Sequence, residues 1–256
     1  MPLDIRLVPM FDDNYGFLIH DPQTGETAVV DPGQPGPIIA ALDALGWSLG
    51  LILNTHHHQD HVGGNQALKA RYGAQVVGPA ADVDRIPGID RGVSEGDLVN
   101  IGTHSAWVLE VHGHTRAHIA YWFSSDAAVF CGDTLFALGC GRLFEGTAED
   151  MWLSLQKLRA LPPETKVYCA HEYTESNCRF ALTVEGQNHT LRARAEAIAA
   201  ARSKNIPTVP STIALERATN PFLRADVSEF LVATGLAGRP AVEAFAEIRR
   251  RKDIFK

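Results

Sequence analysis

The most constraining feature of this sequence is a run of metal-ligand side chains that directly follows a short apolar stretch. The apolar stretch predicts a buried strand, and the residues after it read Asn54-Thr-His-His-His-Gln-Asp-His-Val-Gly-Gly-Asn65. His56, His58 and Asp60 alternate, and alternate side chains of an extended segment face the same side. His61 follows at the turn into the next helix, from where it can reach the same cavity. Imidazole and carboxylate together suit zinc, iron or manganese, so the run predicts a metal site.

Three further ligand-type residues stand directly after predicted strands. They are His114, Asp133 and His171, which follow strands expected at 105–111, 127–132 and 166–169. A rigid sheet can aim side chains from several strand ends at one site. Two metal ions need more ligands than the first run supplies, and these residues provide them.

Two kinds of region follow each other along the chain. The strands are expected at 3–9, 14–20, 26–31, 49–53, 75–78, 97–101, 105–111, 118–123, 127–132 and 166–169, and the helices at 36–46, 62–72, 147–160, 175–185, 189–203, 226–236 and 239–252. Thr147-Ala-Glu-Asp150 predicts a capping box at the start of its helix. From about residue 174 no strand is predicted. We therefore expect an α/β catalytic domain over residues 1–172, with sheets covered by helices, and a helical domain over residues 173–256.

Composition limits the partners and the location. The 256 residues are 45% hydrophobic, enough for at least one substantial core. Lys and Arg total 23 against 30 Asp and Glu, and the net charge of −7 argues against nucleic acid as a partner. No apolar run has the length of a membrane span, and the N-terminus lacks a signal-peptide pattern, so we expect a cytoplasmic protein without membrane contact. The four cysteines form no C-x-x-C pair, and nothing in the sequence demands an oligomer, so a monomer is expected.

The H-x-H-x-D-H run, with the later His, Asp and His, resembles the metallo-β-lactamase superfamily. The resemblance implies a four-layer αβ/βα sandwich with a metal site at one edge of its two sheets. It implies two divalent metal ions per chain, with zinc as the first expectation and iron or manganese as alternatives. The implied ligands are His56, His58 and His114 for one ion, Asp60, His61 and His171 for the other, and Asp133 as a bridge between them.

The same resemblance implies the attacking group. A hydroxide that bridges the two ions, held between Asp60 and Asp133, is the expected nucleophile, because bound cations lower the pKa of water from about 15.7 to about 7. Asp31 ends a predicted strand, and we expect it to orient a ligand histidine.

Blocks along nearly the whole chain are similar to glyoxalase II, the hydroxyacylglutathione hydrolase family. They are Asp13-Asn-Tyr15, Thr55-His-His-His-Gln-Asp-His61, Gly139-Cys-Gly-Arg-Leu-Phe-Glu-Gly-Thr147, His171-Glu-Tyr-Thr174, Thr219-Asn-Pro-Phe-Leu-Arg224 and Arg249-Arg-Arg-Lys-Asp253. The resemblance implies hydrolysis of S-D-lactoylglutathione to glutathione and D-lactate, the second step of methylglyoxal detoxification. The substrate residues that it implies are Arg142, Phe144, Tyr173, Arg249 and Lys252.

Two of these residues depart from the family pattern, since many relatives have Lys and Tyr where this chain has Arg142 and Phe144. Arginine keeps the charge, but phenylalanine cannot donate a hydrogen bond, which costs about 0.5–1.5 kcal/mol of substrate binding.

Four other functions are compatible with parts of the pattern. A lactonase or lactamase does not account for the C-terminal blocks, and a glutathione persulfide dioxygenase uses one iron rather than two metals. A tRNA-processing endonuclease shares H-x-H-x-D-H but conflicts with the acidic charge balance. A protein that only stores metal or senses glutathione would leave an inherently reactive metal site unused.

Overall fold

The structure is a computed structural model that describes residues 1–255, and it divides into two compact units. The first unit comprises residues 1–110 and 117–132, and the second comprises residues 111–116 and the chain from 133 onward. This division follows spatial compactness, and each unit is described by itself. The predicted sequence boundary between residues 172 and 173 stays a prediction.

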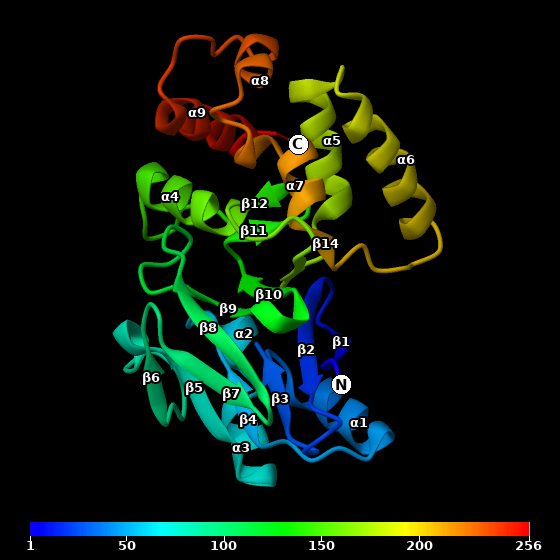
Figure 1. Cartoon of the computed structure of the whole chain (residues 1–256), viewed down its shortest axis with the longest axis vertical. Coiled ribbons are helices and arrows are strands. Elements are labelled where there is room, and N and C mark those ends of the chain that lie inside the picture. Colours follow the sequence, from blue (N-terminus) through cyan, green and yellow to red (C-terminus); the bar gives the residue numbers. More distant parts are fainter. Residues whose placement is uncertain (256) are drawn as a thin grey trace. The chain divides into compact units, whose positions relative to one another are not determined.

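The first unit contains a six-stranded sheet in the order β1-β2-β3-β4-β5-β6 (Figure 1). Its strands are β1 (Asp4–Met10), β2 (Asn14–His20), β3 (Thr27–Val30), β4 (Leu51–Leu53), β5 (Gln75–Pro79) and β6 (Arg91–Val93). β1 to β3 pair antiparallel, whereas β3 to β6 pair parallel. Parallel neighbours need crossover connections, which here carry α1 (Pro35–Leu45), α2 (Gln59–Val62), α3 (Asn65–Tyr72) and η1 (Ala80–Asp82). The carboxyl ends of β3, β4 and β5 therefore share one edge of the sheet.

A second, antiparallel set of strands completes the first unit. Its strands are β7 (Leu98–Ile101), β8 (His104–Glu110), β9 (Ile119–Phe123) and β10 (Ala128–Gly132), in the order β10-β9-β8-β7. The short 3-10 helix η2 (Ser124–Asp126) connects β9 to β10. Phe17 of β2 packs against Phe130 of β10 with ring centroids 5.5 Å apart, which joins the two sheets face to face. Leu18, on the opposite face of β2, packs with Ile38 of α1 and Leu68 of α3. The first unit thus has a core between its sheets and another under its helices.

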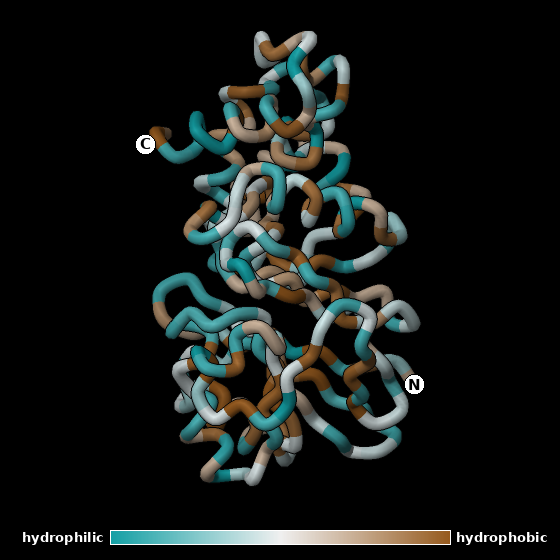
Figure 2. The backbone as a smooth tube through the Cα atoms, turned by 90° about the vertical axis from the view of Figure 1, so that its left-hand side faces the viewer, coloured by the Kyte–Doolittle hydropathy of each residue, from teal (hydrophilic) through white to brown (hydrophobic). Residues whose placement is uncertain are grey.

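The second unit is mainly helical. Its elements are β11 (Leu135–Phe136), β12 (Gly139–Cys140), α4 (Ala148–Arg159), β13 (Lys166–Cys169), α5 (Thr174–Glu185), α6 (His189–Arg202), β14 (Ser211–Thr212), α7 (Ile213–Thr219), η3 (Pro221–Leu223), α8 (Ser228–Ala233) and α9 (Ala241–Asp253). β11 and β12 form a two-stranded antiparallel hairpin. Leu138, at the tip of that hairpin, packs with Ala181 of α5 and Leu191 of α6. Hydrophobic and hydrophilic residues are interspersed along the backbone (Figure 2), and α5 buries one face that includes Asn177, Cys178 and Ala181.

The structure confirms the α/β fold class, the long predicted elements and the capping box. The Thr147 side chain accepts from the Asp150 amide, and the Asp150 side chain accepts from the Thr147 amide. The prediction of no strand after residue 174 is wrong, because Ser211–Thr212 pairs with Lys166–Val167. A two-residue strand is too short to show a period of its own and depends on its partner. Within the described residues, no helix is both long enough and apolar enough to span a membrane.

Candidate metal centre

The ligand loop of the first unit begins where β4 ends, and Asp31 anchors it from the end of β3. Asp31 accepts hydrogen bonds from the Thr55 amide at 2.8 Å and from the Thr55 hydroxyl at 2.7 Å. It also accepts from His61 Nδ1 at 3.1 Å, which leaves His61 Nε2 as the nitrogen that can bind a metal. Asp31 is buried and has a φ of +49°, a left-handed conformation that is uncommon outside glycine. Asp31 thus contacts a histidine that is a proposed ligand, and its role in orienting a metal ligand stays a prediction.

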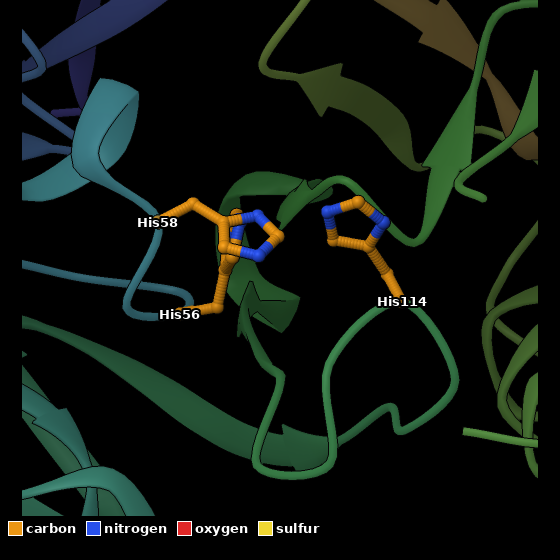
Figure 3. Close-up of side chains that lie close together, drawn as sticks. All are labelled: His56, His58 and His114. Carbon is orange, nitrogen blue, oxygen red and sulfur yellow. The ribbon is translucent and has the colours of Figure 1, made fainter. Parts of the chain in front are cut away.

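The two alternating histidines of the loop point their rings toward one another (Figure 3). The Thr55 hydroxyl donates to Asp31, so it accepts from His56 Nδ1 at 3.0 Å and leaves His56 Nε2 as the ligand atom. His56 Nε2 lies 3.0 Å from His58 Nδ1. Two nitrogens that bind one tetrahedral zinc at 2.0–2.1 Å are about 3.3 Å apart, which is close to this separation. The pair therefore fits two ligands of a single ion.

Asp60 has a different local conformation from the predicted extended one, whereas His61 lies in a helical turn as expected. Both lie in the short helix α2, so the expected extended conformation ends at His58. Asp60 Oδ2 is 3.5 Å from His61 Nε2 and accepts a hydrogen bond from Asn14 Nδ2 at 2.9 Å. The Asp13-Asn-Tyr15 block thus supplies a side chain that holds the Asp60 carboxylate. Sequence spacing did not reveal this contact, because the two residues are 46 positions apart.

His57 lies between the ligand histidines and turns to other partners. Its Nδ1 is 2.9 Å from Asp82, and its Nε2 is 3.1 Å from Arg85 Nη1. An arginine can only donate, so His57 Nε2 accepts and Nδ1 donates to Asp82. Arg85 also donates to Asp82, so His57, Asp82 and Arg85 are each hydrogen-bonded to the other two.

The second unit contributes a carboxylate that faces two histidines. Asp133 Oδ2 lies 3.4 Å from His114 Nε2, and Asp133 Oδ1 lies 3.4 Å from His171 Nε2. His114 Nδ1 donates to the Arg142 carbonyl at 2.9 Å, so its Nε2 is the nitrogen directed at Asp133. All three side chains are buried. One carboxylate oxygen of Asp133 therefore faces each histidine, and its role as a bridge between two ions stays a prediction.

Glycine at position 141 makes this arrangement possible. A Cβ at Gly141 would lie 2.0 Å from the Asp133 carbonyl oxygen and 3.0 Å from His114 Nδ1. The backbone that carries Arg142 can therefore approach the proposed ligands only because residue 141 has no side chain.

His114 is the third side chain drawn in Figure 3, and it comes from the loop after β8.

The donor set of each unit fits a divalent metal ion. Neutral imidazole nitrogens and carboxylate oxygens suit zinc, iron and manganese, and buried carboxylates and histidines at these separations favour cation binding. In the first unit, one ligand atom each from Asp31, His56 and His61 lies within 4.8 Å of the others. The role of each proposed ligand stays a prediction.

The proposed substrate residues lie near the ligands of the second unit. Phe144 is 62% exposed, and its ring centroid is 5.2 Å from that of His114. Tyr173 is 38% exposed and stacks on His171 with a centroid separation of 4.7 Å. Arg142 is exposed. Phe144 thus lies beside His114 and Tyr173 beside His171, while the backbone carbonyl of Arg142 contacts His114.

Arg249 and Lys252 differ in how much of them can meet a ligand. Arg249 is 5% exposed and donates to the Cys140 carbonyl and to Asp253, both at 2.9 Å. Lys252 is half-buried and donates to the carbonyl and the hydroxyl of Ser176 at 3.2 and 3.1 Å. Burial lowers the pKa of Lys252 to about 8, and neighbouring positive charges add to the shift. These charges belong to Arg249, Arg179 and Arg142.

Arg179 is a residue of this cationic group that the sequence did not single out. It is exposed on α5, one turn after Ser176, and its charge acts on Lys252. Arg179 is 73 positions from Lys252 in the sequence, so the sequence alone did not indicate that the two charges are neighbours. The only signal was that Arg179 lies on the predicted helix that follows the His171-Glu-Tyr-Thr174 block. The cluster carries more positive than negative charge and is suited to carboxylates.

The comparisons with known proteins agree along the whole chain. Residues 12–171 match the model of the metallo-beta-lactamase superfamily, and residues 172–255 match that of the hydroxyacylglutathione hydrolase C-terminus. The hydroxyacylglutathione hydrolase of Methylococcus capsulatus is 58% identical over 254 residues, which is 99% of each chain. That of Rhodospirillum rubrum is 53% identical over 253 residues, again 99% of each.

A solved structure shows the same fold. The crystal structure of ETHE1 from Myxococcus xanthus has a TM-score of 0.70 and 27% identity, and the match covers 99% of this chain and 92% of that one. The likeness in sequence thus extends from the ligand loop through the C-terminal helices. The chain belongs to the hydroxyacylglutathione hydrolase family, and through residues 12–171 to the metallo-beta-lactamase superfamily.

Proposed function

We propose that the protein hydrolyses S-D-lactoylglutathione to glutathione and D-lactate, the second step of methylglyoxal detoxification. One observation carries the proposal: the likeness to proteins named hydroxyacylglutathione hydrolase covers 99% of the chain at 58% identity. It therefore includes both the ligand residues and the C-terminal helices. A likeness confined to the metal ligands would support only the fold, because this fold serves many reactions.

The proposed centre holds two divalent ions, with zinc as the first expectation and iron or manganese as alternatives. Its proposed ligands are His56, His58 and His114 for one ion, Asp60, His61 and His171 for the other, and Asp133 between them. When bound, two such ions lower the pKa of water to about 7 and stabilise the negative charge of an oxyanion. The donor atoms described above support this assignment within each unit.

The surrounding residues fix the ligands before substrate arrives. Asp31 holds the His61 tautomer, and Asn14 holds the Asp60 carboxylate. The Arg142 carbonyl does the same for His114. Ligands whose second nitrogen is already hydrogen-bonded lose little freedom on binding, and loss of such a partner typically costs 10–100-fold in affinity or activity.

The substrate residues are proposed to bind the glutathione part, which carries two carboxylates and one ammonium group. Arg142 and Lys252 provide positive charge for a carboxylate. The buried Arg249 adds positive charge nearby, while its guanidinium donates a hydrogen bond to the Cys140 carbonyl. Tyr173 offers a hydroxyl to a peptide group. Phe144 supplies an exposed apolar surface but no donor.

The overall reaction breaks the thioester C–S bond and forms a C–O bond with an oxygen from water. The glutathione sulfur leaves as a thiolate and is protonated to the thiol, and the acyl group becomes the D-lactate carboxylate. The chain residues orient the thioester and keep the charged ligands in place during this exchange.

We also propose that the protein works as a monomer in the cytoplasm. The four cysteines are all buried and free, as is usual in a reducing compartment.

The test is hydrolysis of S-D-lactoylglutathione by the purified protein, followed by loss of the thioester, with metal content measured on the same sample. A chelator-treated sample is the first control. Asp133→Asn is the test variant, and Asp84→Asn is its matched control, because Asp84 is exposed and carries the same charge change.

Rapid, chelator-sensitive hydrolysis that Asp133→Asn abolishes and Asp84→Asn retains would support the proposal. A fully metallated protein that leaves the thioester intact would overturn the substrate assignment and direct attention to lactones and persulfides. Equal activity of the two variants would overturn the role of Asp133.

A further inference from the structure

Side chains from the C-terminal helices hold the backbone of one short segment, residues 136–140, which we name the hairpin segment. Each of its five residues has a backbone atom in such a bond. Asn220 Nδ2 donates to the carbonyls of Phe136 at 3.1 Å and Gly139 at 3.0 Å, Asn177 Nδ2 donates to the Ala137 carbonyl at 3.1 Å, the Leu138 amide donates to Glu216 at 2.8 Å, and Arg249 donates to the Cys140 carbonyl at 2.9 Å.

Asn220 makes the largest number of these contacts. It is fully buried and lies between α7 and η3. Besides the two carbonyls, its Nδ2 lies 2.9 Å from Glu216 Oε2, and its Oδ1 accepts from the Phe222 amide at 3.0 Å. Both ends of the amide are thus occupied, the NH2 group as a donor and the carbonyl oxygen as an acceptor. The Thr219-Asn-Pro-Phe-Leu-Arg224 block gains a role by this contact.

Glu216 anchors the group from the other side. It is fully buried and accepts hydrogen bonds from Arg194 and Ser211 as well as from the Leu138 amide. Arg194 also donates to Thr219 at 2.6 Å. A buried carboxylate needs such a charge partner, so α6 and α7 are locked together behind the hairpin segment.

The hairpin segment itself contains a strained residue. Leu138 has a φ of +59°, which is unfavourable for a residue with a branched side chain. Such conformations persist where the surroundings over-determine them, and they cluster at functional sites. The Glu216 contact to the Leu138 amide and the packing of its side chain provide that constraint.

The position of the hairpin segment is passed on to a proposed metal ligand. Gly141 and Arg142 follow directly, and the Gly141 amide bonds to the Thr134 carbonyl at 3.3 Å. The Arg142 carbonyl accepts from His114 Nδ1 at 2.9 Å, while the Arg142 side chain is a proposed substrate residue. A shift of residues 136–140 would therefore disturb the ligand and the substrate residue together.

We propose that Asn220 is a positioning residue for thioester hydrolysis, which acts by holding the hairpin segment and, through Arg142, the orientation of His114. The proposal rests on the proposed function. Asn220 touches neither the substrate nor the ligand atoms, and its effect passes through backbone carbonyls.

The experiment compares three variants of the metallated full-length protein. Asn220→Ala removes the central amide. Asn177→Ala removes one contact of the hairpin segment and serves if Asn220→Ala does not fold. Asn188→Ala is the matched control, because Asn188 also caps a helix and also donates to a glutamate and a carbonyl, but none of its partners lies in residues 136–140.

Three readouts are needed: amide exchange of residues 136–142, the rate of metal loss to a chelator, and kcat and KM for S-D-lactoylglutathione. We expect Asn220→Ala to speed both the amide exchange of residues 136–142 and the loss of metal to the chelator. We also expect it to lower kcat/KM roughly tenfold, which is the small end of the 10–100-fold loss seen when a residue that orients a metal ligand is removed. Asn177→Ala should show the same changes more weakly. Asn188→Ala should lower the melting temperature without these changes.

If Asn220→Ala lowers stability but matches Asn188→Ala in metal loss and kinetics, Asn220 is only a structural residue and the proposal is wrong. If the wild type does not hydrolyse the thioester, the proposed function fails by itself, and the exchange and metal-loss readouts still decide whether Asn220 positions His114.

Discussion

At the scale of the single residue, Lys252 has a pKa that is unusually close to neutral pH for a lysine. Its surroundings lower its pKa to about 8, burial being the larger cause and nearby arginines the smaller. At pH 7 the lysine is mostly charged, and at pH 9 it is mostly neutral. A carboxylate of glutathione would bind the charged form.

We therefore predict that KM for the glutathione thioester rises roughly fivefold between pH 7 and pH 9, since a hydrogen bond to a charged group is worth about 1.5–3 kcal/mol. Lys252→Arg should remove this rise, because arginine stays charged throughout. Lys252→Met should show the high KM already at pH 7. Steady-state kinetics in overlapping buffers provides the measurement, and the same pH profile in wild type and Lys252→Met would refute the role of Lys252.

The titration of Lys252 would not produce such a rise by unfolding the protein. From about pH 8 to 10.5 the unfolded chain binds more protons at this lysine than the folded chain does. Its titration therefore increases stability with pH in this range.

Asp60 supports a second prediction at this scale. Asp60→Asn keeps the shape of the side chain but removes the charge that faces His61, so we expect metal content to fall and activity to drop at least roughly 100-fold, beyond the usual loss for an indirect partner. Elemental analysis and turnover are measured on the same preparation. Asp84→Asn is the control, and near-normal metal content in Asp60→Asn would exclude Asp60 as a ligand.

At the scale of the element, the hairpin of β11 and β12 and the residues after it depend on close backbone approach. In Gly141→Ala, the new Cβ would meet the Asp133 carbonyl oxygen at 2.0 Å, and neither group can rotate away. We expect a loss of about 1–3 kcal/mol in the free energy of unfolding, typical of overpacking, together with weaker metal binding.

The matched control is Gly36→Ala, where nothing lies within 4 Å of the new Cβ. Urea unfolding and chelator competition provide the measurements for both variants. Unchanged stability and metal affinity in Gly141→Ala would show that this segment does not constrain Asp133.

The elements also differ in how well the sequence alone predicts them. The ligand-type residues could be found because each follows a strand, and strand ends are marked by apolar runs. The helical state of Asp60 was missed, because the four-residue helix α2 has no periodicity to detect. The role of Asn220 was missed for another reason: its carbonyl partners lie 81 and 84 positions away, and only the folded chain brings them together. Short elements and distant polar contacts are therefore the parts that pattern alone could not predict.

At the scale of the whole molecule, the proposed ligands come from segments that are far apart in the sequence. The first four lie within residues 56–61, whereas His114, Asp133 and His171 follow at intervals of 19 residues or more. The unfolded chain does not hold such segments together, so the proposed ions would bind the folded protein far better than the unfolded chain.

Removal of the metal should accordingly lower stability as well as activity. A ligand present at 1,000 times its dissociation constant stabilises a folded protein by about 4 kcal/mol, and for a chain of this size that corresponds to roughly 10 °C in melting temperature. We expect a chelator to lower the melting temperature by this amount and to abolish hydrolysis, and we expect added zinc to restore both. Calorimetry with and without chelator measures the shift. In Asp133→Asn the chelator should have a much smaller effect, because the variant has lost the carboxylate proposed to bridge the ions. A melting temperature that the chelator leaves unchanged in the wild type would mean that the metal does not stabilise the folded protein, even if activity is lost.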